Sequence, residues 1–412
     1  MSVVIDLSDI NFKLESPGAD INYVGSVPYY FRSGTIYVDG KQITSPTRSA
    51  TTVEYNANSK LKEIVKISSD VSIVDKTLKE TELRKLLRGT NGYVSLNASV
   101  DRHMSKMKYS PLHGFIVRPQ NKAKHVLASR KEEYERIYDY SAMIASNTGA
   151  KFWGLTFPHF IPIEDIKDLW QRYVIDRESN APYPMIFLDP SDEDFTAFQY
   201  VTPFLKSSVS SGHIPAIGLH YSSPVKMQPI LRDLIRVFKD LDVAIITTGI
   251  ERESRYKSLS GPHGQEIFMS DVVALGSGRM PPPKQNGNGD IITKKEQVIK
   301  AFEGNVLTIS HLKAILGDKE RIEGLLESIR SLRSTELKEL ILTIVQTYTI
   351  KEILEDEEMS ETLSYALKLH ELERSGDEIH FSKKFAQQGE VREYVREVKP
   401  TLGEWLNYIR TR

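Results

Sequence analysis

The stretch AIGLHYSSPVKMQPILRDLIRVFKDLDVAIITTGI, residues 216–250, decides the fold class. It contains two short apolar runs, Ala216–Leu219 and Val243–Ile246, separated by the amphipathic stretch Pro229–Lys239. Each run is continuous rather than alternating, which is typical of a strand buried on both faces. A strand, a helix and a second such strand form the crossover unit of a parallel sheet. The stretch therefore predicts an α/β protein.

The same alternation extends in both directions from this unit. We predict five further strands on the same grounds: Tyr93–Leu96, Phe115–Val117, Phe152–Phe157, Met185–Leu188 and Val272–Leu275. The total is one short of the eight strands of a closed (β/α)8 TIM-type barrel. We expect such a barrel, with one strand overlooked in the amino-terminal portion or in residues 155–215. The alternative is an open, doubly wound sheet.

The remainder of the chain divides around this core, which is expected over residues 76–280. Residues 1–75 predict a β-rich N-terminal extension, with strands such as Asn22–Val24, Tyr29–Phe31 and Thr35–Val38 and a hairpin turn at Asp39-Gly40. Residues 281–305 open with three prolines and predict a linker or insertion, and residues 306–412 predict a helical C-terminal region.

Composition excludes several classes of chemistry. The 412 residues contain no cysteine, which rules out disulfides, thiol nucleophiles, thiolate zinc sites and iron–sulfur clusters. The ten histidines show no metal-ligand spacing, so no metal and no cofactor is expected. No apolar run approaches the roughly 20 residues that span a bilayer, and the first residues do not resemble a secretory signal. We expect a cytoplasmic protein with no membrane partner.

Polar and glycine-rich corners follow the last two predicted strands. Thr247, Thr248 and Gly249 end one strand, and the stretch Gly276, Ser277, Gly278, Arg279 follows the next. Parallel strands end at one shared edge, where glycine lets backbone N–H groups approach an anion and hydroxyl groups add donors. These corners predict a phosphate-binding or other substrate-binding site. Small residues that simply turn tight corners are the alternative.

Other strand ends offer candidate catalytic and binding side chains. Asp189 follows the strand Met185–Leu188 and can serve as a base or a nucleophile, although its surroundings also fit a turn that caps a helix. His220 follows Ala216–Leu219 and can move a proton or hydrogen-bond a ligand. The two earliest core strands are followed by three candidate substrate-binding residues: Asn97, Arg118 and Gln120. The basic segment Arg102–Lys108 is either a solvated surface or a phosphate contact.

Read in order, these elements resemble the tRNA-guanine transglycosylase superfamily, which includes the DNA 7-deazaguanine transglycosylases. The segments that carry the resemblance are AIGLHYSSPVKMQPILRDLI, VAIITTGIERES, SDVVALGSGR, GTNGYVSLNASVDRHM and HGFIVRPQ. The resemblance implies base exchange on tRNA or DNA. It also implies a nucleophilic aspartate near Ala274, where the nearest carboxylate is Asp271, and a second aspartate near Arg118. Asp189 and Asp271 are therefore the candidate catalytic carboxylates. The family's zinc ligands, largely cysteines, are missing.

Three functions stay open on the sequence. The first is a transglycosylase-like barrel that binds a nucleotide or nucleic acid at its strand ends and exchanges or modifies a base. The second is a metabolic enzyme that holds phosphate or flavin mononucleotide (FMN) at the two glycine corners. The third is a non-catalytic partner protein or viral structural protein, which would assemble as a homo-oligomer or hetero-oligomer.

Overall fold

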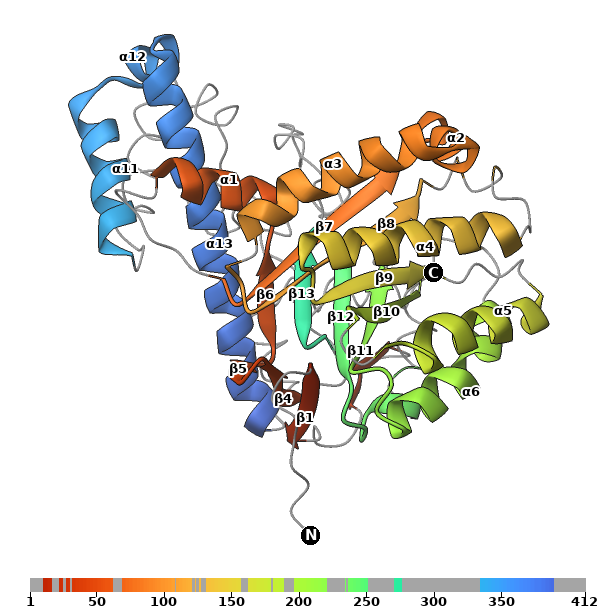
Figure 1. Ribbon diagram of the computed structural model, residues 1–412. Helices are drawn as coiled ribbons and strands as arrows, with labels where there is room; N and C mark the ends of the chain where they lie inside the picture. The colour runs from red at the N-terminus through yellow and green to blue at the C-terminus, as the bar shows by residue number, and fades with distance from the viewer. Residues whose placement is uncertain are drawn as a thin grey trace, which may run out of the picture.

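The computed structural model describes residues 10–16, 22–24, 27–29, 32–61, 69–107, 109–120, 123, 126, 131–156, 162–178, 181–188, 196–220, 234, 236–250, 270–275 and 334–388. These residues form an α/β structure in which helices cover a curled parallel sheet (Figure 1). A small antiparallel sheet lies at one end of it. The predicted α/β class and the parallel sheet are confirmed.

Eight strands pair in parallel to form the curled sheet. They are β6 (Thr47–Ala50), β7 (Val71–Leu78), β8 (Leu112–Pro119), β9 (Phe152–Thr156), β10 (Tyr183–Leu188), β11 (Ala216–His220), β12 (Ala244–Ile250) and β13 (Val272–Leu275). Neighbours follow chain order, and β13 pairs with β6, so the pairings close into a ring. All eight carboxyl ends therefore point to one side, which we call the mouth.

Two phenylalanines and three glycines account for the packing inside the ring. Phe152 and Phe187 are fully buried in a cluster that also contains inward-facing residues of the neighbouring strands. A Cβ atom added to Gly218 would lie 2.3 Å from the Phe187 ring, and one added to Gly114 would lie 2.6 Å from the Phe152 ring. A Cβ atom added to Gly154 would lie 2.8 Å from Ile116 and 3.1 Å from the Phe187 ring. Large and small residues thus alternate between facing strands, as close packing requires.

The opposite end of the ring is covered by the antiparallel sheet of β1 (Asn11–Ser16), β4 (Ser33–Val38) and β5 (Lys41–Thr44). Phe12, Ile36 and Ile43 from this sheet belong to the same buried cluster as the ring interior. The predicted turn at Asp39-Gly40 joins β4 to β5, with positive φ at both residues. A separate hairpin is formed by β2 (Asn22–Val24) and β3 (Val27–Tyr29).

Helices follow most of the parallel strands and pack on the outside of the ring. They are α1 (Thr52–Leu61), α2 (Glu80–Arg88), α3 (Thr90–Met107), α4 (Lys131–Thr148), α5 (Ile163–Trp170) with the π-helix η2 (Gln171–Ile175), and α6 (Thr196–Ser210). The C-terminal region contributes α11 (Thr335–Thr347), α12 (Ile350–Glu355) and α13 (Glu357–Gln388). The long helix α13 contacts α1 and β6, and α11 and α12 extend beyond the ring beside it (Figure 1).

Several sequence predictions need correction. Tyr93–Leu96 is not a strand but part of α3. Two parallel strands, β6 and β7, were not predicted, and both begin before residue 76, where the core was expected to start. The predicted linker at residues 281–305 and the strand end at Phe31 lie outside the described residues.

Candidate functional site

Register and alternation identify the side chains that face the mouth. Asp75 of β7 pairs with Ile116 of β8, and Ile116 belongs to the buried cluster inside the ring. Directly paired residues of parallel strands point to the same side, and side chains alternate along each strand. Thr77 and Arg118, two residues further on, therefore face inward near the carboxyl ends. On β11 and β12 the same reasoning places His220 and Thr248 inward.

Asp75 and Arg118 form a bidentate ion pair at the mouth. The Arg118 Nε donates to Asp75 Oδ1 at 2.9 Å and to Oδ2 at 3.2 Å, and Nη2 donates to Oδ2 at 3.2 Å. The Arg118 side chain is 17% exposed and the Asp75 side chain is 23% exposed. The pair is therefore partly buried but still accessible to solvent. These three hydrogen bonds fix the direction of both groups. The Asp75 carboxylate is thereby held in one orientation.

A second charged pair stands beside this one, on the outward side of β7. The Lys76 Nζ donates to Glu82 Oε1 at 3.0 Å, and the Lys79 backbone N–H donates to Glu82 Oε2 at 2.9 Å. Burial acts to raise the pKa of Glu82, but these two hydrogen bonds and the nearby lysine charges lower it more, so the pKa lies below its usual value. Glu82 is thus ionised in the first turn of α2, where its hydrogen bonds connect this helix to β7.

On the other side of the mouth, His220 lies against the end of β12. Its Nδ1 is 3.4 Å from Thr248 Oγ1, and Thr248 is buried. The pairing of β12 with β13 is irregular between Thr247 and Ile250, and Gly249 within it has φ of +70°. A Cβ atom at Gly249 would lie 2.1 Å from the imidazole Cε1. The absence of a side chain at Gly249 is therefore what allows His220 to occupy this position.

Gly249→Ala is expected to lower the free energy of unfolding by about 1–3 kcal/mol, because alanine is strained at positive φ and its methyl group would displace the imidazole. Urea denaturation measures this loss. The control is Gly212→Ala, which shares a positive φ of 72° but has nothing within 4 Å of the added Cβ. If the two variants lose the same stability, the contact with His220 contributes nothing.

Asp271 does not lie at the mouth. It precedes β13, at the end of the ring covered by the antiparallel sheet, and it is fully buried. Arg32 donates to its Oδ2 at 3.1 Å through Nε, and Ser45 Oγ donates to Oδ1 at 2.6 Å. The Ile245 backbone N–H also donates to Oδ2, at 2.7 Å. The hydrogen bonds of this carboxylate join the antiparallel sheet to β12 and β13, at the end of the ring opposite the mouth.

The remaining candidates divide into three groups. Thr247 is buried and its hydroxyl group bonds Ser270, so it faces away from the mouth. Asn97 lies on α3, outside the ring, because its predicted strand is a helix, and Gln120 is exposed just beyond β8. Asp189 and the stretch Gly276, Ser277, Gly278, Arg279 lie outside the described residues. Of the predicted site residues, Arg118, His220, Thr248 and Gly249 lie at the mouth.

Sequence reasoning missed Asp75, the carboxylate that faces the mouth from β7. The signal was present, since VSIVDKTL at residues 71–78 contains a β-branched run followed by a charged residue. Because the sequence analysis predicts no strand at β7, it does not identify Asp75 as a residue near the carboxyl end of a strand. The resemblance places an aspartate near position 118, where this chain has Arg118, and Arg118 contacts Asp75 of the neighbouring strand.

Comparisons with known proteins leave the family of this chain open. Within the part of the chain that the structure describes, no group of His, Asp and Glu side chains could hold a metal ion. Within the same residues, every helix is too short or too polar to cross a membrane. No protein-family pattern matches the sequence, and no curated protein matches it.

Proposed function

We propose that this protein is a transglycosylase-like barrel that binds a nucleotide or a nucleic acid at the mouth, where it exchanges or modifies a base. The observation that carries the proposal is the placement of two polar pairs on opposite sides of one ring. Asp75–Arg118 belongs to β7 and β8, and His220–Thr248 belongs to β11 and β12. Two strands separate the pairs in either direction around the ring. A ligand that contacts both pairs must extend across the mouth.

The chemistry of each side suggests which part of a nucleotide it would contact. His220 can donate a proton and Thr248 carries a hydroxyl group, which together suit a phosphate or a leaving base. Asp75 supplies a carboxylate with a fixed direction, which suits attack on a sugar carbon or removal of a proton. Arg118 would neutralise that carboxylate at rest and could contact a phosphate oxygen during turnover.

The proposal includes the architecture. We infer that the ring is the core of a (β/α)8 TIM-type barrel, since its strands are all parallel and helices follow β6, β7, β8, β9 and β10. In barrels of that kind ligands bind where the strands end, which is the mouth defined here.

Binding of free nucleotides tests the mouth directly. Isothermal titration with a guanosine and an adenosine 5′-monophosphate should give a measurable Kd for the wild-type protein. His220→Ala should weaken it at least tenfold, because the variant removes the donor that faces the ligand. The matched control is His213→Ala, on the loop after α6, which should leave the Kd unchanged. Equal affinities for the two variants, or no binding by the wild-type protein, would rule out the mouth as a nucleotide site.

Base exchange has its own test. Incorporation of a radiolabelled guanine or 7-deazaguanine into tRNA or DNA should fall by roughly 10²–10⁴-fold in Asp75→Asn, the range for loss of an acid–base group. Asp70→Asn changes the same residue type at the opposite end of β7, where the side chain is exposed, and should keep full activity. Unchanged incorporation in Asp75→Asn would exclude this carboxylate from the reaction.

A further inference from the structure

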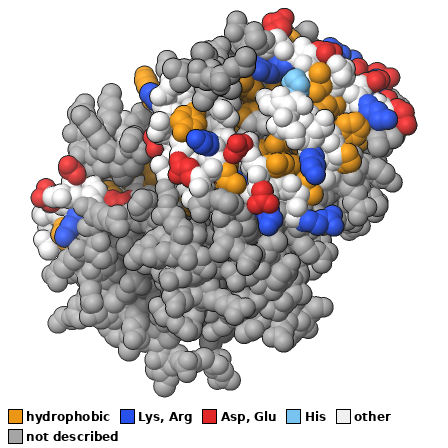
Figure 2. Space-filling model, turned by 90° about the horizontal axis from the view of Figure 1, so that it is seen from below, with side chains coloured by type: hydrophobic (Ala, Val, Ile, Leu, Met, Phe, Trp, Pro, Cys, Tyr) orange, Lys and Arg blue, Asp and Glu red, His pale blue; other side chains and the backbone are white. Residues whose placement is uncertain are grey.

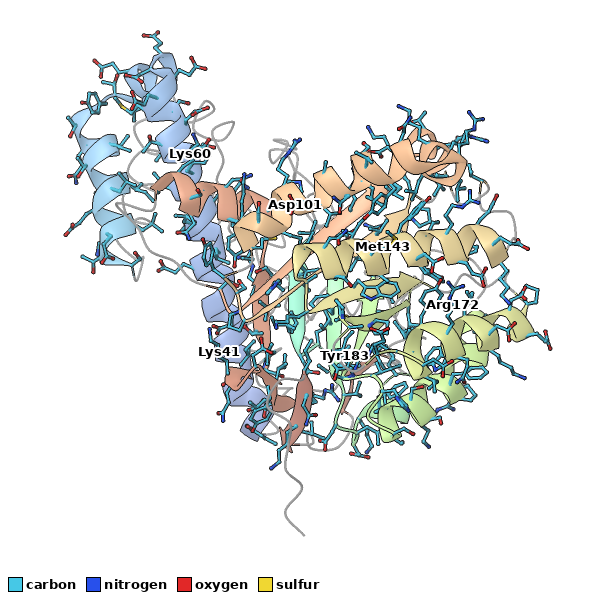
Figure 3. The ribbon with its side chains drawn as sticks, viewed as in Figure 1. Lys41, Lys60, Asp101, Met143, Arg172 and Tyr183 are labelled. Atoms are coloured by element: carbon cyan, nitrogen blue, oxygen red, sulfur yellow. The ribbon has the colours of Figure 1, made fainter. Side chains whose placement is uncertain are left out.

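A group of basic side chains gathers on the flank of the ring where α1 meets α3. Lys60 of α1 and Arg102, His103 and Lys106 of α3 make up this group, which we call the α1–α3 basic patch. The two helices are in contact, and Figure 3 labels Lys60 on one and Asp101 on the other. Residues three and four apart on a helix share a face, so Arg102 and Lys106 point the same way. The patch therefore bridges two helices.

The cations of the patch are not matched by carboxylates. Lys106 Nζ donates to the neutral amide oxygen of Asn56 at 2.6 Å, which ties α3 to α1. Lys60 lies four residues beyond Asn56 on α1, so it shares that face. Among the described residues, neither Lys60 nor Arg102 forms an ion pair. Asp101 is the exposed acid beside the patch and does not pair with these cations.

His103 reports the positive potential of this flank. Burial lowers its pKa below the usual value, and the charges of Lys106, Arg102 and Lys76 lower it further. Its Nδ1 is buried and has no hydrogen-bond partner among the described residues. Lys76 is itself paired with Glu82, so the unbalanced charge near His103 comes from Arg102 and Lys106 of α3. Three separate cations thus act on one imidazole.

On the face seen in Figure 2, described side chains of both signs are mixed. In the view of Figure 2, the described Lys and Arg side chains are interspersed with Asp and Glu side chains and separated by hydrophobic ones. On the α5 side, Lys131 lies between Asp165 and Asp168, and Arg172 between Glu135 and Asp139. Paired charges of this kind offer little to an anionic partner. The protein as a whole has a formal net charge of −1, so the patch is a local feature.

We infer that the α1–α3 basic patch binds the sugar–phosphate backbone of a nucleic acid strand. Unpaired, exposed cations spaced along two adjoining helices suit a chain of phosphates better than a single anion, because each phosphate can meet one cation. The inference deepens the proposed function, on which it rests, by naming a polynucleotide rather than a free nucleotide as the substrate class. Lys106 precedes Met107, whose carbonyl oxygen accepts from Ser72 near the amino end of β7, so a bound strand would run along the outside of the ring from the patch toward the mouth.

Salt-dependent binding of a fluorescein-labelled 20-nucleotide single strand, as RNA and as DNA, tests the patch by fluorescence anisotropy. The double variant Arg102→Glu with Lys106→Glu should weaken binding at least tenfold in dilute salt. It should also reduce the slope of log K against log salt concentration by about 1.4, the value for two lost phosphate contacts on a single strand. The matched control is Lys167→Glu with Lys206→Glu, which changes net charge equally on the exposed α5 and α6 surfaces and should bind as the wild type does.

Nuclear magnetic resonance of His103 adds a second readout. Saturation with the strand should raise the pKa of this imidazole, because phosphates offset the surrounding cations, and should leave the chemical shifts of His213 unchanged. The inference is overturned if both double variants bind equally, if His103 does not respond, or if the protein binds phosphatidylserine vesicles and not the strand. Failure of the mouth proposal looks different: the strand would still bind, while nucleoside monophosphates would not.

Discussion

Asp271→Ala is expected to lower the free energy of unfolding by about 3–5 kcal/mol, the range for removing one partner of a buried ion pair. The variant leaves the Arg32 guanidinium, 3% exposed, without a counter-charge. It also removes the acceptor of Ser45 Oγ and of the Ile245 backbone N–H. Arg32 keeps its hydrogen bonds to the carbonyl oxygens of Phe238 and Val243, but neither carries a full charge. Urea denaturation followed by circular dichroism measures the loss.

A surface aspartate provides the control for this prediction. Asp168 pairs with Lys131 at 2.6 Å, but its side chain is 67% exposed, so Asp168→Ala should cost no more than about 1 kcal/mol. If Asp271→Ala also costs less than about 1 kcal/mol, the buried pair does not join the antiparallel sheet to the ring. The same variant should retain nucleotide binding at temperatures where it is folded, because Asp271 lies at the opposite end from the mouth.

Phe187→Ala is expected to lower the free energy of unfolding by about 3–5 kcal/mol, because it opens a cavity in the middle of the ring. Phe187 is 2% exposed, and its ring occupies the space left by Gly154 and Gly218. Gly218→Ala alone should cost about 1–3 kcal/mol, since its methyl group would meet the ring at 2.3 Å. Once the ring is gone, the added methyl group has room.

Coupling between the two positions is the sharper test. In the double variant, Gly218→Ala should be neutral or slightly stabilising, so the two costs should not add. Gly114→Ala is the control, because its methyl group would meet the Phe152 backbone oxygen at 2.5 Å, which Phe187→Ala does not relieve. Simple additivity of Phe187→Ala and Gly218→Ala would contradict the packing described here. Thermal unfolding of the four proteins measures the coupling.

The strands predicted correctly from the sequence are continuous apolar runs, whereas the strand β6 is not. Val272–Leu275 and Ala216–Leu219 are continuous apolar runs, which only a strand covered on both faces requires. By contrast, β6 reads TRSA, and its burial depends on neighbours far along the chain. Tyr93–Leu96 contains strand-forming residues, but Leu96, Val100 and Met104 continue at helical spacing. The longer pattern was the better guide there.

The candidate Asp271 came from the resemblance, as the carboxylate nearest Ala274, and not from its position on a strand. Asp271 is polar and adjoins a strand, but it precedes the strand, so it lies at the amino end of the ring. His220 and Arg118 follow their strands and lie at the mouth. The ion pair between Asp75 and Arg118 joins residues 43 positions apart, and no local pattern links them. The sequence shows whether a residue precedes or follows a strand. It does not show which distant residue will form an ion pair with it.

The antiparallel sheet at the amino end has a practical consequence for anyone who trims this protein. A version that starts at Pro46 would keep all eight strands of the ring yet lose Phe12, Ile36 and Ile43, which cover its floor. It would also lose Arg32 and Ser45, so the Asp271 carboxylate would remain without its cation in an uncovered apolar surface. Such a fragment should aggregate rather than fold.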